Sequence, residues 1–207
     1  MQVIKLISRI MGVNTYVIYN EDTMEAVIID PSFDARKIIN CIAAEKLTVK
    51  AILLTHGHYD HICGVDAVKK EFGVPVYISR EDAPMLTSAA LNLSGGHGFP
   101  ITCGAADVLI EDGQELELIG EKIKVISTPG HTKGSVTYQV NDVLFTGDTL
   151  FYLSIGRTDF PGGSFKEITE SLKKLAALSG EADYVVHPGH EQSSSLEFET
   201  INNPYMQ

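Results

Sequence analysis

The sequence predicts a layered α/β fold, and three features of its pattern indicate this class. Short segments rich in Val and Ile recur in both halves of the chain, as is typical of strands. Helical segments lie between them, and in the clearest one, 165–178, Ile168, Leu172 and Leu175 fall on one apolar stripe. The order is strands with helices, then strands, a helix and a strand. This order favours two β-rich halves with helices outside.

The first half is predicted to begin with three strands and then to alternate helices with strands. Gly12 and the pair Glu21-Asp22 interrupt the early strands, because turns favour such residues. The spacing of Ile38 and Ile42 is helical. We therefore expect strands at 3–10, 14–19, 24–29, 50–54 and 74–78, and helices at 34–46 and 61–72.

The middle of the chain has a weaker pattern, and the second half returns to strands. Residues 80–90 are interpreted as a helix and 91–104 as a loop, since the latter is rich in Gly and Ser. After Gln114 we expect strands at 115–119, 122–127, 135–140, 143–145 and 183–186, with the helix 165–178 before the last of them.

Composition limits the function classes. The chain has 207 residues, a formal net charge of -11 and a pI of about 5.0, and we interpret 1–207 as a single domain. An acidic chain is a poor match for nucleic acid or an anionic membrane surface, so neither is expected as a partner. The three cysteines, Cys41, Cys63 and Cys103, are odd in number and lack CxxC spacing. With no leader pattern and no apolar run long enough for a span, the sequence favours a cytoplasmic protein.

The segment Thr55-His56-Gly57-His58-Tyr59-Asp60-His61 carries the strongest chemical signal. It follows the apolar strand AILL and precedes a predicted helix, so its side chains leave a buried strand end together. Neutral imidazoles and carboxylates are ligands that Zn²⁺ and related metals prefer. The alternative is a polar turn with Asp60 near a helix N-terminus, but such a turn rarely needs three histidines.

Three further motifs each follow an apolar strand. They are STPGHT with His131, FTGDT with Asp148, and HPGH with His190. A lone histidine or aspartate in a turn is more often structural than a ligand. Together, however, the four motifs place His or Asp just past the ends of four strands, where α/β folds build active sites.

In this order and spacing, HxHxDH, TPGHTxGS, GDTLF and a late PGH resemble the signature of metallo-β-lactamase-fold hydrolases, over about residues 12–190. The resemblance implies an αββα sandwich with two divalent metal ions at one edge of the sheets. It assigns the first metal to His56, His58 and His131, and the second to Asp60, His61 and His190. Asp148 matches the carboxylate that bridges both.

Within that superfamily, GDTLF followed by SIGRTDFPGG resembles the glyoxalase II group. The resemblance implies that Arg157 helps to hold the substrate and that the substrate is a small thioester such as S-lactoylglutathione. Only seventeen residues follow His190, so we expect no helical C-terminal domain of the larger enzymes. The chain is more similar to short, single-domain glyoxalase II-like proteins.

The mechanism expected from this resemblance is attack on the thioester carbonyl by a metal-bound hydroxide. Asp60 and Asp148 are the expected catalytic carboxylates, and Arg157 would use its planar fork on the substrate. Zinc is the first choice of metal, and iron or manganese also suit His and Asp ligands. The oligomeric state is left open.

Three other functions were weighed. A persulfide dioxygenase of the same fold would use a single iron, with His56, His131 and Asp148 as its facial triad. A nuclease of the superfamily is disfavoured by the acidic charge. A protein with a purely structural metal is disfavoured because seven candidate ligands for two metals leave open coordination positions.

Four more polar residues have weaker predictions. His97 lies in a Gly-rich loop and is interpreted as exposed rather than lining the cleft. His187 matches no ligand of the family, which favours packing, or support of a ligand from behind, over metal coordination. Asp30 is equally compatible with orienting a ligand histidine and with a turn before Pro31. Ser135 is expected to bond the backbone or a ligand rather than act as a nucleophile.

Overall fold

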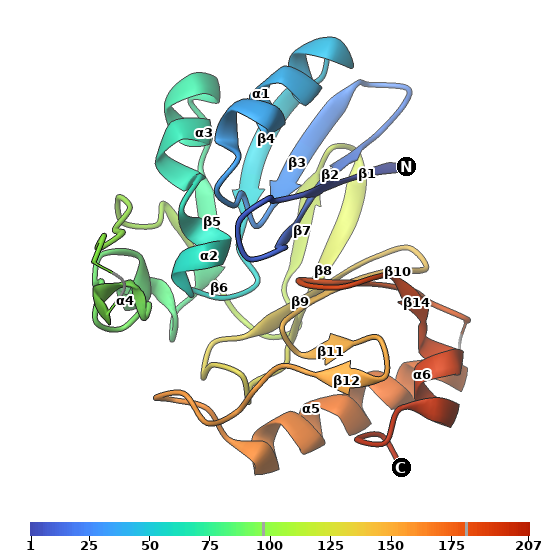
Figure 1. The fold of residues 1–207 in the computed structure, drawn as a ribbon. Helices are drawn as coiled ribbons and strands as arrows, with labels where there is room; N and C mark the ends of the chain where they lie inside the picture. The colour runs from blue at the N-terminus through green and yellow to red at the C-terminus, as the bar shows by residue number, and fades with distance from the viewer. Residues whose placement is uncertain (97, 181) are drawn as a thin grey trace.

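The computed structural model describes residues 1–96, 98–180 and 182–207 and contains two six-stranded sheets (Figure 1). In the first sheet, β1, β2 and β3 are antiparallel neighbours, and β3 to β6 run parallel. Its strands, in spatial order, are β1 (Gln2–Ile7), β2 (Asn14–Tyr19), β3 (Glu25–Ile29), β4 (Thr48–Leu53), β5 (Val76–Ser79) and β6 (Val108–Ile110).

The second sheet has the order β14-β13-β10-β9-β8-β7. Antiparallel pairing joins β7 to β8, β8 to β9 and β9 to β10, whereas β10 and β13 are parallel. As a result β8, β10 and β13 all run in one direction and end at the same edge. The strands are β7 (Glu115–Leu118), β8 (Glu121–Ser127), β9 (Val136–Val140), β10 (Val143–Gly147), β13 (Val185–Pro188) and β14 (Ser194–Ser195).

Helices cover the outer face of each sheet, which gives four layers (Figure 1). The first sheet is covered by α1 (Ala35–Ala44) and α3 (Val65–Phe72), and the second by α5 (Phe165–Ala176) and α6 (Leu196–Asn202). The arrangement confirms the predicted αββα sandwich.

The sequence of β2 explains the layering. Tyr16 and Ile18 point into the core between the sheets, while Val17 packs in the core under the helices. Side chains of a strand alternate between faces, so an apolar residue at every position buries both faces of the sheet. On α5, Ile168 and Leu172 are buried, as the helical stripe predicts.

Several predicted elements differ from the structure. The helix expected at 61–72 is two helices, α2 (Tyr59–Ile62) and α3, because the chain turns at Gly64, where a Cβ would lie 2.4 Å from the Ser32 carbonyl oxygen. The helix expected at 80–90 is only α4 (Ala83–Leu86). A 3₁₀ turn, η1 (Ser94–Gly96), lies within the predicted loop, and a second, η2 (Ala177–Gly180), extends α5.

Five short elements had no sequence prediction: β6, β11 (Leu150–Phe151), β12 (Ser154–Ile155), β14 and α6, of which β11 and β12 pair as a ribbon. Strands of two or three residues leave too few positions for a period to be recognised. Within the described residues, none of the helices is both long and apolar enough to cross a membrane.

Candidate metal centre

The candidate metal ligands lie in four loops that meet at one edge of the sandwich. Three of these loops follow β8, β10 and β13, whose common direction brings their ends together. The fourth is the segment after β4 of the facing sheet, where the turn between β4 and α2 carries His56 and His58, and α2 itself carries Asp60 and His61. The topology therefore brings together motifs that are far apart in the chain, such as those of His61 and His190, which are separated by 129 residues.

His56, His58 and His131 form the first group, and their nitrogen atoms lie within 4.8 Å of one another. Nδ1 of His58 is 2.9 Å from Nε2 of His131. The opposite nitrogen of His131, Nδ1, donates to the Arg157 carbonyl oxygen at 2.7 Å, which leaves the lone pair of Nε2 facing the group.

Burial keeps the rings of His56 and His58 neutral. It lowers the pKa of His58 to about 3, with neighbouring His131 acting in the same direction. Burial also lowers the pKa of His56 well below its ordinary value, helped by His61 and His131. Neutral imidazoles at neutral pH are the form that binds a metal ion.

Asp60, His61 and His190 form the second group, also within 4.8 Å. Nε2 of His190 lies 3.5 Å from Oδ2 of Asp60 and 3.4 Å from Nε2 of His61. Burial alone would raise the pKa of the Asp60 carboxyl, but His61 and His190 outweigh it and hold that pKa below its usual range. Asp60 is therefore a carboxylate at neutral pH.

Asp148 lies between the two groups. Its Oδ2 is 3.5 Å from Nε2 of His131 in the first group and 3.6 Å from Nε2 of His190 in the second. Its Oδ1 is 3.4 Å from Nε2 of His61. One carboxylate thus contacts the nitrogens of both groups.

Two buried atoms in this cluster have no hydrogen-bond partner among the described residues: Nε2 of His56 and Oδ1 of Asp148. Leaving a buried polar atom unsatisfied costs about 1–3 kcal/mol. Both atoms point to a cation that would satisfy them, and a set of imidazoles and carboxylates is the chemistry that a divalent metal ion needs. The residues therefore fit metal binding.

Asp30 orients His61 from behind. Its Oδ2 lies 3.0 Å from Nδ1 of His61 and accepts the Thr55 hydroxyl at 2.6 Å, while its Oδ1 accepts the Thr55 amide at 2.8 Å. Although Asp30 also lies close enough to His56 and His61 to be a metal ligand, both of its oxygens are already used. Of the two interpretations left open by the sequence, orientation of a ligand histidine matches these contacts.

Asp82 holds the first group in place, although it belongs to no recognisable sequence motif. This buried carboxylate accepts the Gly57 amide at 3.0 Å, the Thr132 hydroxyl at 2.7 Å and the Gly134 amide at 2.9 Å. Gly57 separates His56 from His58 in the chain, and Thr132 follows His131. Asp82 therefore ties together the two loops that carry these three histidines.

Gly189 allows two loops to approach closely. Its amide donates to the Gly147 carbonyl at 2.8 Å, which joins the loop of His190 to that of Asp148. A Cβ at Gly189 would lie 2.3 Å from Oδ1 of Asp148 and 2.8 Å from Cε1 of His61. The motif PGH needs glycine at this position for lack of space.

A cleft of about 680 Å³ opens onto the cluster, and its wall includes His58, Asp60, His131, Asp148 and His190. This volume is in the ordinary range for small-molecule sites. Arg157 also lines the cleft, and its Nε and Nη2 donate to the Asp159 carboxylate at 2.7 Å each.

Other polar residues lie outside the cluster. The ring of His187 packs 5.0 Å from that of Tyr16 and its Nδ1 lies 2.7 Å from the Ser193 hydroxyl, which confirms the predicted packing role. Ser135 bonds the amide and hydroxyl of Thr132, as expected for a structural serine. All three cysteines are free, but only Cys103 is fully buried. His97 lies outside the described residues.

Comparison with known proteins agrees with this fold and cluster. The sequence profile of the Metallo-beta-lactamase superfamily matches residues 9–190. The chain is 36% identical to the probable metallo-hydrolase YqgX of Bacillus subtilis, covering 93% of this chain and 92% of the relative. It is 34% identical to the hydroxyacylglutathione hydrolase GloC of Haemophilus influenzae, with 90% and 89% covered.

Solved structures lead to the same class. BLEG-1 B3 metallo-beta-lactamase superposes with a TM-score of 0.94 at 39% identity, over 100% of both chains. TTHA1623 in a di-iron-bound form has a TM-score of 0.87 at 31% identity, over 98% and 100%. ETHE1 from Myxococcus xanthus has a TM-score of 0.82 at 30% identity, over 99% and 84%. The fold and the His/Asp cluster define a metal-binding enzyme, and the chain belongs to the metallo-beta-lactamase superfamily.

Proposed function

We propose that this protein is a binuclear metal-dependent hydrolase that cleaves a small thioester. The position of Asp148 carries the proposal, because its carboxylate lies 3.4–3.6 Å from histidine nitrogens of both groups. A carboxylate shared in this way offsets the repulsion between two bound cations. The first metal would be held by His56, His58 and His131, and the second by Asp60, His61 and His190, with Asp148 between them.

The bound metals, zinc in our proposal, would activate water and polarise the scissile carbonyl as Lewis acids. The protein's own side chains hold the metal ligands in place and orient the attacking water. Hydrogen bonds from His61 to Asp30 and from His131 to the Arg157 carbonyl fix both rings with Nε2 toward the cluster. Asp60 lines the cleft as a carboxylate, so it can accept a hydrogen bond from the attacking water and orient it.

A thioester suits this site because a thiolate leaves without a strong general acid. Near neutral pH such an acid is most often a histidine, and each histidine of the cluster is assigned to a metal. The relative named hydroxyacylglutathione hydrolase makes S-lactoylglutathione the first compound to test. Arg157, which lines the same cleft, is proposed to contact the substrate.

The second candidate is a persulfide dioxygenase, which the similarity to ETHE1 favours. It would use one iron held by His56, His131 and Asp148, and the nitrogen of His131 lies 3.5 Å from Asp148. Oxygen chemistry at such a site needs a redox-active metal, whereas hydrolysis does not.

Two measurements on the purified protein separate these functions. Metal analysis gives the stoichiometry and identity of the bound ions. Rates are then measured on S-lactoylglutathione, on other thioesters and on a β-lactam, and oxygen uptake is followed with glutathione persulfide. Two metals per chain with thioester cleavage are expected. One iron per chain, with oxygen consumed and no thioester cleaved, would replace the hydrolase proposal by the dioxygenase.

A further inference from the structure

Beyond the metal ligands, most residues in the wall of the cleft are apolar or aromatic. Met11 comes from the loop after β1, Tyr59 from the start of α2, and Leu93 from the loop before η1. The segment that follows Asp148 provides Phe151, Ile155 and Phe160. Phe160 packs edge-on against the ring of His58, at 5.6 Å between centroids, so this apolar surface begins directly beside the cluster.

Two of these apolar side chains are placed in the cleft at a conformational cost. Met11 has φ of 64° and Leu93 has φ of 70°, the left-handed region that favours glycine. Strain of this kind costs about 1 kcal/mol or more for each residue and is often kept where it serves a site. Neighbouring contacts hold both positions. The Tyr59 hydroxyl donates to the Met11 sulfur at 3.6 Å, and the side chain of Asn92 bonds the Met85 and Ile101 carbonyls.

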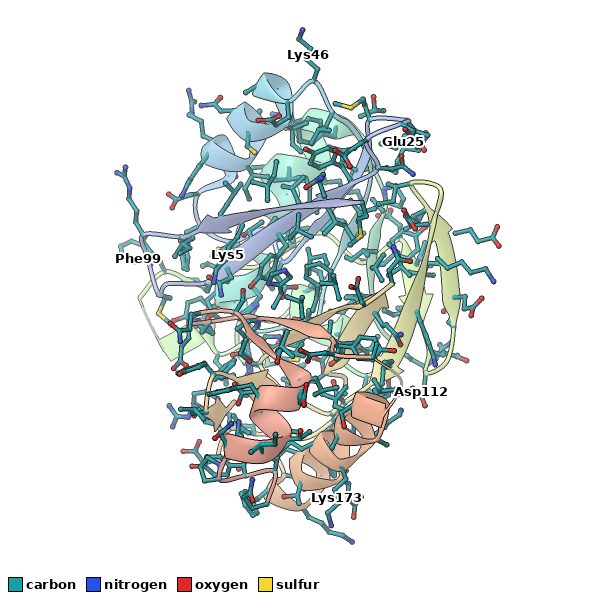
Figure 2. The ribbon with its side chains drawn as sticks, turned by 90° about the vertical axis from the view of Figure 1, so that its right-hand side faces the viewer. Lys5, Glu25, Lys46, Phe99, Asp112 and Lys173 are labelled. Atoms are coloured by element: carbon teal, nitrogen blue, oxygen red, sulfur yellow. The ribbon has the colours of Figure 1, made fainter. Side chains whose placement is uncertain are left out.

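The two loops that carry Met11 and Leu93 also expose apolar side chains to solvent. Ile10 is 53% exposed, Leu91 52% and Phe99 83%, and Figure 2 shows Phe99 at the margin of the molecule. Exposed apolar side chains in loops beside a cleft are typical of a site for an apolar ligand.

The protein's own charges outside the metal cluster do not favour an anionic group in the rest of the cleft. Arg157 is the sole Lys or Arg among the described residues that line it, and its guanidinium is paired through two hydrogen bonds with Asp159. The same guanidinium lies 3.9 Å above the Phe160 ring. This exposed pair adds little stability, but it cancels the positive charge that Arg157 would present. Glu191, also in the wall, adds a negative charge.

We propose that the preferred thioester carries an apolar, uncharged group that packs on Met11, Leu93 and Phe160, rather than the carboxylates of glutathione. The inference rests on the proposed thioesterase function. It identifies Met11 and Leu93 as substrate-binding residues, and the Arg157–Asp159 pair as the element that disfavours anions.

The test is a matched panel of substrates for the metal-loaded enzyme. Acetyl, butyryl and hexanoyl groups are each attached to neutral N-acetylcysteamine and to glutathione, two alkyl thiols that are similar leaving groups. We expect kcat/KM to favour the neutral thiol by about tenfold or more. It should also rise with acyl length by up to about fourfold per methylene, the value for full burial.

Equal rates on both thiols, or a preference for glutathione without dependence on chain length, would overturn this inference and leave the thioesterase proposal intact. If none of the six compounds is cleaved while the metals are bound, the thioesterase proposal fails and this inference fails with it.

Variants separate substrate binding from folding. Met11→Gly and Leu93→Gly relieve left-handed strain, so the melting temperature should not fall, whereas KM for the hexanoyl substrate should rise by roughly tenfold. Lys46→Gly is the control, because Lys46 is also left-handed (φ 56°) and exposed but lies outside the cleft. Equal effects from Lys46→Gly would contradict the assignment.

The charge argument has its own variant. Asp159→Ala frees the Arg157 guanidinium, so kcat/KM for the glutathione thioesters should increase several-fold relative to the neutral ones. A ratio that does not change would show that the pair does not set the charge preference. The inference would then be wrong in its electrostatic part.

Discussion

Oδ2 of Asp30 accepts the Thr55 hydroxyl at 2.6 Å and lies 3.0 Å from Nδ1 of His61, so one buried oxygen joins the end of β4 to a candidate ligand. The left-handed backbone at Asp30, with φ of 50°, aims its carboxylate at both partners. The contact with Asp30 favours a proton on Nδ1 of His61, so Nε2, the atom that faces Asp148 and His190, is the one that can bind a metal ion.

Asp30→Asn should disable His61 without unfolding the protein. An amide nitrogen facing His61 would favour the proton on Nε2, which removes that atom as a ligand. We expect metal affinity at the second group to fall by about 10–100-fold. Metal titration with chelator competition measures this change, and circular dichroism checks the fold. Wild-type affinity at both positions would show that Asp30 does not set the orientation of His61.

Asp82→Asn should act on the other group. The side-chain NH₂ of the asparagine would then face the Gly57 or Gly134 N–H, and two donors cannot bond each other. One of the three hydrogen bonds is lost, so the loops that carry His56, His58 and His131 become less tightly held. We expect unfolding to become easier by about 1–3 kcal/mol. Metal affinity should fall at the first group, whereas the second group, which includes Asp60, should keep its affinity.

Asp107→Asn is the matched control, because Asp107 also accepts a backbone amide, that of Val76, but is exposed and distant from the cluster. If Asp82→Asn lowers both metal affinities equally, the effect is general destabilisation and the specific role of Asp82 is contradicted.

Asp148→Ala should reduce activity more than Asp60→Ala. Asp148 contacts nitrogens of both groups, whereas the nitrogens nearest Asp60 belong to His61 and His190 alone. We expect the Asp148 variant to lose metal from both positions and its activity to fall by at least about 100-fold, since even residues behind the ligands contribute 10–100-fold. Metal content per chain and kcat/KM are measured on both variants. Near-normal metal content in Asp148→Ala would refute the bridging proposal.

The sequence predicted those strands and helices in which the apolar pattern continues over several residues. The strand expected at 14–19 matches β2, and the helix expected from 165 matches α5, where Ser164 caps the first turn by accepting the Glu167 amide. The prediction was wrong at 80–90, where α4 ends at Leu86, because a segment with one proline and few large apolar residues has no period that indicates where a helix ends.

The candidate site also has a part that the sequence predicts and a part that it does not. All seven proposed ligands lie in motifs that can be recognised locally, and the structure brings them together. Asp30 and Asp82 act on partners 25 or more residues away, such as Thr55 and Gly134. Only the folded chain reveals such partners. The apolar wall from Met11 to Phe160 was not predicted either, because its residues come from four segments that are far apart in the chain.

His187 should make the fold sensitive to acid. Burial, followed by the charge of Lys5, lowers the pKa of His187 to about 4 from an ordinary 6.5. The unfolded chain then binds a proton more readily, so stability is fully present above pH 6.5 and is lost as the pH falls toward 4. The ring is only half-buried, so we expect a loss of about 1 kcal/mol between pH 7 and 5.

His187→Phe keeps the ring packed against Tyr16 and removes the titration. Urea unfolding of metal-free protein at pH 7 and 5 measures the free energy of unfolding of both proteins, with the metal ligands common to each. The variant should lose about 1 kcal/mol less than the wild type over this range. An identical loss in both would assign the acid sensitivity to other groups.

Gly189→Ala should abolish activity through a single methyl group. Gly189 does not have the left-handed backbone that would strain an alanine, so the effect depends on space alone. The new Cβ would lie 2.3 Å from Oδ1 of Asp148, far inside van der Waals contact, and the carboxylate must move away from both groups of histidines. We expect the loss of metal and activity to resemble that of Asp148→Ala.

Gly180→Ala is the control, since its Cβ would meet nothing within 4 Å. Metal content, kcat/KM and melting temperature are compared for the two alanine variants. Gly189→Ala with normal metal content and rate would mean that Asp148 can bind from a displaced position. The close packing of the PGH turn on that carboxylate would then not be what sets the geometry of the site.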